Sequence, residues 1–170
     1  MKRVKNTYDM KAVLDYENLS SLVRRRLGFV FAELSSSDSK YDQSMSILLR
    51  VLSNFATIGA DGSSYRIKCK NTRISIKADK LRDNLKDPKK WAAQTVNEHP
   101  MPLNNLWNVW KSKGGQLTEK EIWDDLIKHP MVTITKEEDA VLRGLGKQFE
   151  VNNIGDRYRL AGIELILSTK

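Results

Sequence analysis

The chain has 170 residues, of which 40% are hydrophobic and 29% are charged, values typical of a globular protein large enough to bury a core. A single cysteine excludes an intrachain disulfide, and no apolar run is long enough to span a membrane, so we expect a cytoplasmic protein, or a nuclear one if the source is eukaryotic. The formal net charge is +8, and its surplus falls in residues 1–114, where we expect any anionic partner to bind.

The first predicted helix carries a run of three arginines. Apolar residues recur at three- and four-residue steps from Lys11 to Leu34, which predicts a helix. Arg24, Arg25 and Arg26 fall inside it and point in different directions around its axis. The triplet is either a solvated helix face or an extension of a phosphate-binding surface.

A second helix is predicted between Tyr41 and Phe55. Its apolar side chains follow helical spacing, which is typical of a stripe packed into a core. Gly59, followed by the turn Ala60-Asp61-Gly62, is expected to end this helix.

The stretch from Ser64 to Lys80 alternates between apolar residues and basic or polar ones. Two such runs flank Asn71-Thr72, a pattern typical of half-buried strands joined as a β-hairpin. The apolar side includes Cys69, for which we expect a buried and unreactive thiol. Five basic side chains and no acid share the opposite side: Arg66, Lys68, Lys70, Arg73 and Lys77.

This basic side of the expected hairpin is the main candidate for a binding surface. Like charges facing one another on a β-ribbon destabilise it, so a chain that keeps this many is expected to bind an anion, usually a nucleic acid. We predict phosphate contacts from all five side chains. A two-stranded ribbon also fits the major groove of DNA, which would allow limited base readout. The alternative is a solvated edge hairpin whose lysines block pairing with another sheet.

Two short helices are predicted next. Asp79 is the expected cap of a helix over Lys80–Leu85. Asp87, followed by proline, is typical of a helix start, and Lys89 and Lys90 come directly after it, where they would extend the basic surface. The neighbouring tryptophan, residue 91, is either a buried anchor or a platform on which a base stacks.

The sequence His99-Pro100-Met101-Pro102 interrupts the helical pattern, so we expect a division into residues 1–100 and residues 101–170. Beyond it, apolar residues at helical spacing end at Gly114-Gly115. Two capping boxes then open helices, one with Thr118 as its first residue and one with Thr135. A second hairpin is predicted from Phe149 to Ile166.

The order helix, helix, helix and two-stranded wing resembles the winged helix-turn-helix family over residues 103–167. The resemblance implies a third helix in the DNA major groove and a wing beside it. It assigns Lys136, Arg143 and Lys147 to that helix, and Arg157 and Arg159 to the wing. Winged helices also bind proteins, and the surplus of acidic residues in 115–170, where 8 lysines and arginines stand against 10 aspartates and glutamates, favours this alternative.

Several kinds of chemistry have no motif in this sequence. The two histidines, His99 and His129, have no further cysteine or histidine at the spacing of a metal site, so we expect no metal. No glycine-rich phosphate loop or glycine-flanked serine nucleophile occurs, so we expect neither a cofactor nor an enzyme.

Together these features predict an α+β, mainly helical protein: a helical N-terminal part with a basic β-hairpin, then a winged-helix-like C-terminal part. The expected function is non-catalytic nucleic-acid binding through the hairpin, with duplex DNA favoured over RNA and no membrane contact. The alternative is an adaptor or inhibitor that binds a protein partner through residues 103–167.

Overall fold

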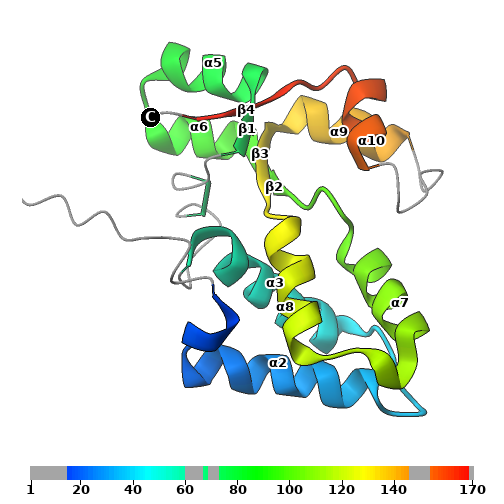
Figure 1. Cartoon of the computed structure of the whole chain (residues 1–170). Helices are drawn as coiled ribbons and strands as arrows, with labels where there is room; N and C mark the ends of the chain where they lie inside the picture. The colour runs from blue at the N-terminus through cyan, green and yellow to red at the C-terminus, as the bar shows by residue number, and fades with distance from the viewer. Residues whose placement is uncertain (1–14, 60–66, 69–72, 146–153, 169–170) are drawn as a thin grey trace, which may run out of the picture.

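The computed structural model describes residues 15–59, 67–68, 73–145 and 154–168. Within these ranges the chain is mainly helical and carries one small mixed sheet of four strands (Figure 1). The expected α+β, mainly helical fold class is therefore confirmed. None of the described helices is both long enough and apolar enough to cross a membrane.

One end of the molecule is a helical bundle around the largest hydrophobic core (Figure 1). Three tryptophans, Trp107, Trp110 and Trp123, are almost fully buried there. The apolar stripe predicted between Tyr41 and Phe55 packs into the same core. Among the described residues, the bundle comprises two short 3-10 helices and four α-helices: η1 Tyr16–Asn18, α2 Ser21–Leu34, α3 Gln43–Ile58, α7 Leu103–Lys113, η2 Gly114–Gln116 and α8 Glu119–Lys128.

Local signals in the sequence set the ends of these helices. The carboxylate of Asp42 accepts a hydrogen bond of 2.8 Å from the backbone N–H of Met45 and so caps α3. Gly59 ends α3 with a φ of 67°, a left-handed conformation that costs glycine little. Thr118 and Glu121 form the predicted capping box of α8. The predicted stop at Gly59 and the predicted capping box at Thr118 are confirmed, whereas the cap by Asp42 was not predicted.

The other end of the molecule is organised around the sheet. Its strands lie in the order β2-β3-β1-β4. Ile74 in β1 faces Thr133 in the parallel neighbour β3 and Ile166 in the antiparallel neighbour β4. Strand β2 pairs with β3 in antiparallel register. The strands are β1 Arg73–Ser75, β2 Thr95–Glu98, β3 Val132–Thr135 and β4 Leu165–Leu167.

Helices cover both faces of this sheet (Figure 1). On one face, α5 (Ile76–Leu85) and α6 (Pro88–Gln94) pack with Ile74 around Trp91. On the other face, α9 (Lys136–Gly144) and α10 (Ile154–Leu160) pack with the inward side chains of β3. Alternate side chains of each strand point to opposite faces, so strands this short still contribute to two cores.

A buried carboxylate joins the starts of α5 and α9. Ser75 caps α5 by accepting a hydrogen bond of 3.1 Å from the N–H of Ala78, and Thr135 caps α9 in the second predicted capping box. Glu138, which is 3% exposed, accepts a hydrogen bond of 2.6 Å from Ser75 Oγ and one of 2.9 Å from Thr135 N–H. This network fixes where α5 begins relative to α9.

The hairpin predicted over Ser64–Lys80 is wrong. Residues 67–68 are helical, and the strand covers only Arg73–Ser75, whose partners are β3 and β4. The chain enters α5 at Ile76, with Ser75 rather than Asp79 as its cap. The alternating pattern wrongly indicated a second strand, because a short strand followed directly by a capped helix buries the same apolar residues that a half-buried hairpin strand would bury.

The second predicted hairpin and its wing are also wrong. Residues Ile154–Leu160 form helix α10, and β4 pairs with β1 from a distant part of the chain. Arg157 and Arg159 therefore lie on a helix rather than on a wing. Helix α9 ends at Gly144, and residues 146–153 lie outside the described ranges.

Elements from both sides of residue 100 are combined in each half of the molecule. Strands β1 and β2 precede this residue, whereas β3 and β4 follow it. Likewise, α2 and α3 pack against α7 and α8. The two parts expected from the sequence therefore share a sheet and a core.

Candidate nucleic-acid interface

Exposed lysines gather on α5 and α6, two helices that pack against each other on one face of the sheet. Lys77 and Lys80 are three residues apart on the solvent side of α5, because residues at this spacing share a helix face. Lys89 and Lys90 stand in the first turn of α6. We call the following set the α5–α6 lysine surface: Lys77, Lys80, Lys86, Lys89 and Lys90.

The connection between α5 and α6 is built tightly. Lys86 ends α5 in the left-handed region, with a φ of 51°. The carboxylate of Asp87 then accepts hydrogen bonds of 2.9 Å from the N–H of Lys89 and 3.2 Å from that of Lys90. Pro88 at the first position of α6 already has the backbone angle that a helix needs. The backbone geometry of this connection therefore fixes the positions from which the side chains of Lys89 and Lys90 project.

A buried tryptophan holds the two helices together. Trp91 is 2% exposed, and its Nε1 donates a hydrogen bond of 2.9 Å to the carbonyl of Ala78 in α5. The guanidinium of Arg82 lies 5.8 Å from the centre of the Trp91 ring and also bonds Asp79 and Ser168. Trp91 is thus a buried anchor, and it offers no platform for a base.

Positive charge on this surface has little compensation. Residues 73–94 contain seven lysines and arginines against three aspartates. Asp79 is paired with Arg82, and Asp87 is engaged by the start of α6. Within the described residues, the side-chain ammonium groups of the five lysines of the α5–α6 lysine surface form no ion pair and no hydrogen bond.

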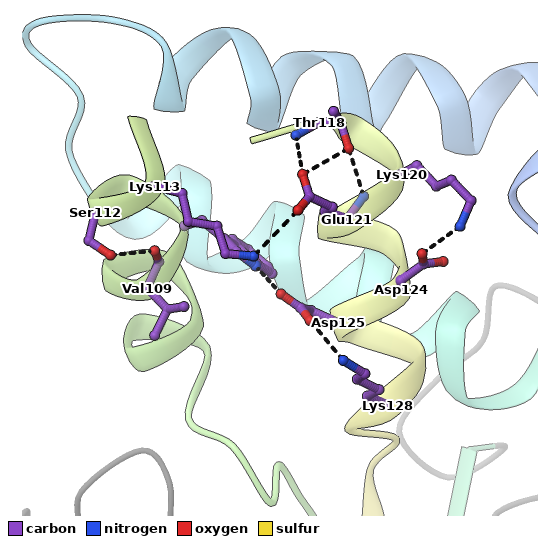
Figure 2. Close-up of polar contacts among 10 residues, drawn as sticks. Val109, Ser112, Lys113, Thr118, Lys120, Glu121, Asp124, Asp125 and Lys128 are labelled. Carbon is purple, nitrogen blue, oxygen red and sulfur yellow. Dashed lines mark hydrogen bonds and ion pairs between the residues drawn. The ribbon is translucent and has the colours of Figure 1, made fainter. Parts of the chain in front are cut away.

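The lysines of α7 and α8 are arranged differently. Figure 2 shows Lys113, Lys120 and Lys128 each beside a carboxylate. The fourth lysine of these two helices, Lys111, donates a hydrogen bond of 2.8 Å to the carbonyl of Ser39. Lys120 lies 2.6 Å from Asp124, and Lys113 lies 3.7 Å from Glu121. A third pair, Lys128 with Asp125, is 3.8 Å apart. This side of the bundle is therefore nearly neutral locally, and the contrast marks α5 and α6 as the uncompensated region.

The arginine triplet lies far from the α5–α6 lysine surface. Helix α2 and helix α5 are at opposite ends of the molecule in Figure 1. Arg24 donates hydrogen bonds of 3.0 Å to the carbonyls of Tyr16 and Glu17, and Arg26 lies 5.8 Å from the ring centre of Phe55. Arg25 is exposed. The structure therefore does not join the triplet to Lys89 and Lys90 in one patch.

Three arginines assigned through the winged-helix resemblance are also dispersed. Arg143 is paired with Asp139 within α9. Arg157 lies 2.6 Å from Glu98, whose other carboxylate oxygen accepts a hydrogen bond from the hydroxyl of Tyr158. Burial raises the pKa of Glu98, although both partners oppose that shift. Arg159 is exposed on α10.

The remaining sequence-predicted residues differ in their placement. Arg73 is exposed at the start of β1, next to Leu167 in the register of β4. Four residues lie outside the described ranges, so their assignments stay predictions: Arg66, Cys69, Lys70 and Lys147.

Lys68 turns inward instead of outward. Its Nζ donates hydrogen bonds of 2.7 Å to the carbonyl of Ala92 and 2.5 Å to that of Thr95, where α6 ends. A cation is favourable at the C-terminal end of a helix, where carbonyl groups lack partners. The outward strand position expected for Lys68 is therefore wrong, and the residue supports α6.

This contact has a measurable consequence for stability. We expect Lys68→Met, which keeps the aliphatic stem, to lower the free energy of unfolding by about 1.5–3 kcal/mol, because two carbonyls lose a charged donor. Lys89→Met is the matched control, since that side chain is exposed, and it should leave stability unchanged. Urea denaturation of both variants measures the difference. Equal stability of the two would contradict this role of Lys68.

Sequence reasoning selected Lys77, Lys89 and Lys90 but missed Lys80 and Lys86. Helical spacing from Lys77 to Lys80 was the available signal, and the strand assignment concealed it. Among the described residues, no group of three or more potential ligands is placed to hold a metal ion. Comparisons of this chain with protein-family models, curated proteins and solved structures find no match. The case for an interface therefore comes from the charge and geometry of the chain itself.

Proposed function

We propose that this protein is a non-catalytic nucleic-acid-binding protein that holds duplex DNA by its phosphates at the α5–α6 lysine surface. The observation that carries the proposal is the set of exposed lysines on two packed helices, without intramolecular partners in the described part of the chain. Each such lysine is available to replace a counterion condensed on DNA, and the release of that counterion favours binding.

The shape of the surface favours a duplex over a single strand. Proteins that bind single strands combine basic grooves with exposed aromatic rings on which bases stack. Among the described residues of α5 and α6 the aromatic ring is that of Trp91, which is buried, whereas the exposed Phe29 lies on α2 at the other end of the molecule. Contacts from α5 and α6 would then reach phosphates rather than bases, so we expect weak dependence on nucleotide sequence.

Two charge-reversal doubles test the location. In Lys89→Glu plus Lys90→Glu, the new acids stand in the first turn of α6, where they suit the helix dipole, so the fold is expected to hold. We expect the affinity for a short duplex to fall at least about tenfold, which corresponds to ~1.4 kcal/mol. Fluorescence anisotropy with a labelled duplex at one fixed salt concentration measures it.

The matched control is Arg25→Glu plus Lys40→Glu, which changes the net charge equally through exposed residues of the helical bundle. This double should keep most of the affinity. If Arg25→Glu plus Lys40→Glu abolishes binding while Lys89→Glu plus Lys90→Glu binds normally, the bundle end of the molecule is the interface and the proposal is wrong. Circular dichroism of all variants confirms that they are folded.

A second candidate function is an adaptor that binds a protein through the C-terminal part. It is favoured by large apolar side chains exposed on three elements of that part: Val141 on α9, Leu160 on α10 and Leu167 on β4. Exposed apolar groups of this kind are common in protein interfaces. Absence of binding to any duplex at low salt would make this candidate the leading one.

A further inference from the structure

A polar cleft of about 490 Å³ lies beside the bundle, away from the α5–α6 lysine surface. Its walls come from α3, the end of β2 and its connection to α7, the start of α7, and α10. This volume is within the range of sites for small molecules. Besides the paired Glu98 and Arg157, the polar lining residues are Tyr41, Ser46, Arg50, Asn97, His99 and Asn104.

The charges that line this cleft leave a positive surplus. The carboxylate of Glu98 is matched by Arg157 at 2.6 Å and accepts a second hydrogen bond from Tyr158. Arg50 is exposed, and no described residue forms an ion pair or hydrogen bond with its guanidinium. His99 adds no charge near neutral pH, because burial, with a smaller effect from Arg50, lowers its pKa to about 4.

The start of α7 supplies hydrogen-bond donors at the same place. Its N-cap is Pro102, which has no side chain that could cap the helix. The N–H groups of Asn105 and Leu106 both bond the carbonyl of Pro102, whereas those of Leu103 and Asn104 have no partner among the described residues. An uncapped helix start with free N–H groups and a positive dipole end favours a bound anion.

An independent feature of the wall also indicates a missing ligand. The Nε2 atom of His99 is shielded from solvent and has no hydrogen-bond partner among the described residues. A buried polar atom without a partner destabilises a folded protein. Because His99 lines the cleft, a small turn of its imidazole toward the cleft would let a ligand with a hydrogen-bonding group satisfy this atom.

From this combination we infer that the cleft binds a small molecule that carries a phosphate group. The phosphate would lie between the guanidinium of Arg50 and the N–H groups that begin α7, where a dianion receives both charge and directed hydrogen bonds. The rest of the molecule would lie toward His99 and Asn97, whose side chains select a polar group. The inference does not depend on the proposed DNA surface, because α5 and α6 do not line the cleft.

Titration calorimetry of the full chain tests this site with three probes: adenosine 5′-monophosphate, adenosine and inorganic phosphate. We expect the monophosphate to bind, adenosine not to bind, and inorganic phosphate to compete. Arg50→Ala should weaken the monophosphate at least about tenfold, whereas Arg25→Ala, an equally exposed arginine on α2, should have no effect. No binding of the monophosphate, or equal affinity for Arg50→Ala, would overturn the inference.

A second comparison distinguishes a free small molecule from the 5′-phosphate at the end of a nucleic-acid strand. Two duplexes that differ only in a 5′-phosphate are measured against the wild type and Arg50→Ala. If the phosphorylated duplex binds more tightly and loses that advantage in Arg50→Ala, the phosphate source is a nucleic-acid end. If both duplexes bind equally while the monophosphate still binds, the source is a free small molecule.

Discussion

Replacing Trp91 by alanine is expected to lower the free energy of unfolding by about 3–5 kcal/mol, which is among the largest effects of a single substitution in this protein. The ring is 2% exposed and fills the space between α5, α6 and the sheet. Its loss leaves a cavity and removes the hydrogen bond of 2.9 Å to the carbonyl of Ala78. Urea unfolding monitored by circular dichroism measures the change.

The conservative variant separates the two contributions of this side chain. Trp91→Phe keeps an aromatic ring but removes the Nε1 donor, so we expect a loss of roughly 1–3 kcal/mol, smaller than that of Trp91→Ala. A loss below ~1 kcal/mol for Trp91→Ala would mean that the side chain is not packed as described. Since Trp91 holds the lysine-bearing helices together, the alanine variant should also bind DNA more weakly.

Glu138 gives the second large expected effect. Glu138→Ala removes the acceptor shared by Ser75 Oγ and the N–H and hydroxyl of Thr135, all of which are buried. We expect the free energy of unfolding to fall by about 2–3 kcal/mol, because buried donors are left without partners and two helix starts lose their link. Thermal and urea denaturation provide the measurement.

Glu137 is the matched control for this prediction. It precedes Glu138 in the same first turn of α9 but is exposed. Glu137→Ala should leave stability nearly unchanged. Equal losses from the two substitutions would show that the helix dipole, rather than the buried network, accounts for the effect.

The helix ends were predictable because their signals are local. The caps by Asp87, Thr118 and Thr135 and the stop at Gly59 depend on a few neighbouring residues, and all four are found in the structure. The sheet was not predictable in this way. Its strands have three or four residues each and pair across long stretches of the chain, so local alternation does not identify their partners.

The residues of the candidate site also divide into those with local sequence signals and those placed by tertiary contacts. Lys89 and Lys90 were found because a capped helix start places them on the surface. Lys68 was assigned to the wrong environment, because only the tertiary structure brings it to the carbonyls of Ala92 and Thr95. Glu138 belongs to the acidic start of α9, but its side chain is buried. Its carboxylate therefore does not repel an anionic partner at the surface.

If the α5–α6 lysine surface binds DNA by replacing counterions, the affinity for DNA falls steeply as the salt concentration rises. The dissociation constant for one duplex is measured at several salt concentrations for the wild type and for Lys89→Glu plus Lys90→Glu. We predict a steep wild-type dependence, with a log–log slope of about −0.9 for each phosphate neutralised, and a slope shallower by roughly 2 in the double variant. An affinity independent of salt, or identical slopes for the two proteins, would contradict this account.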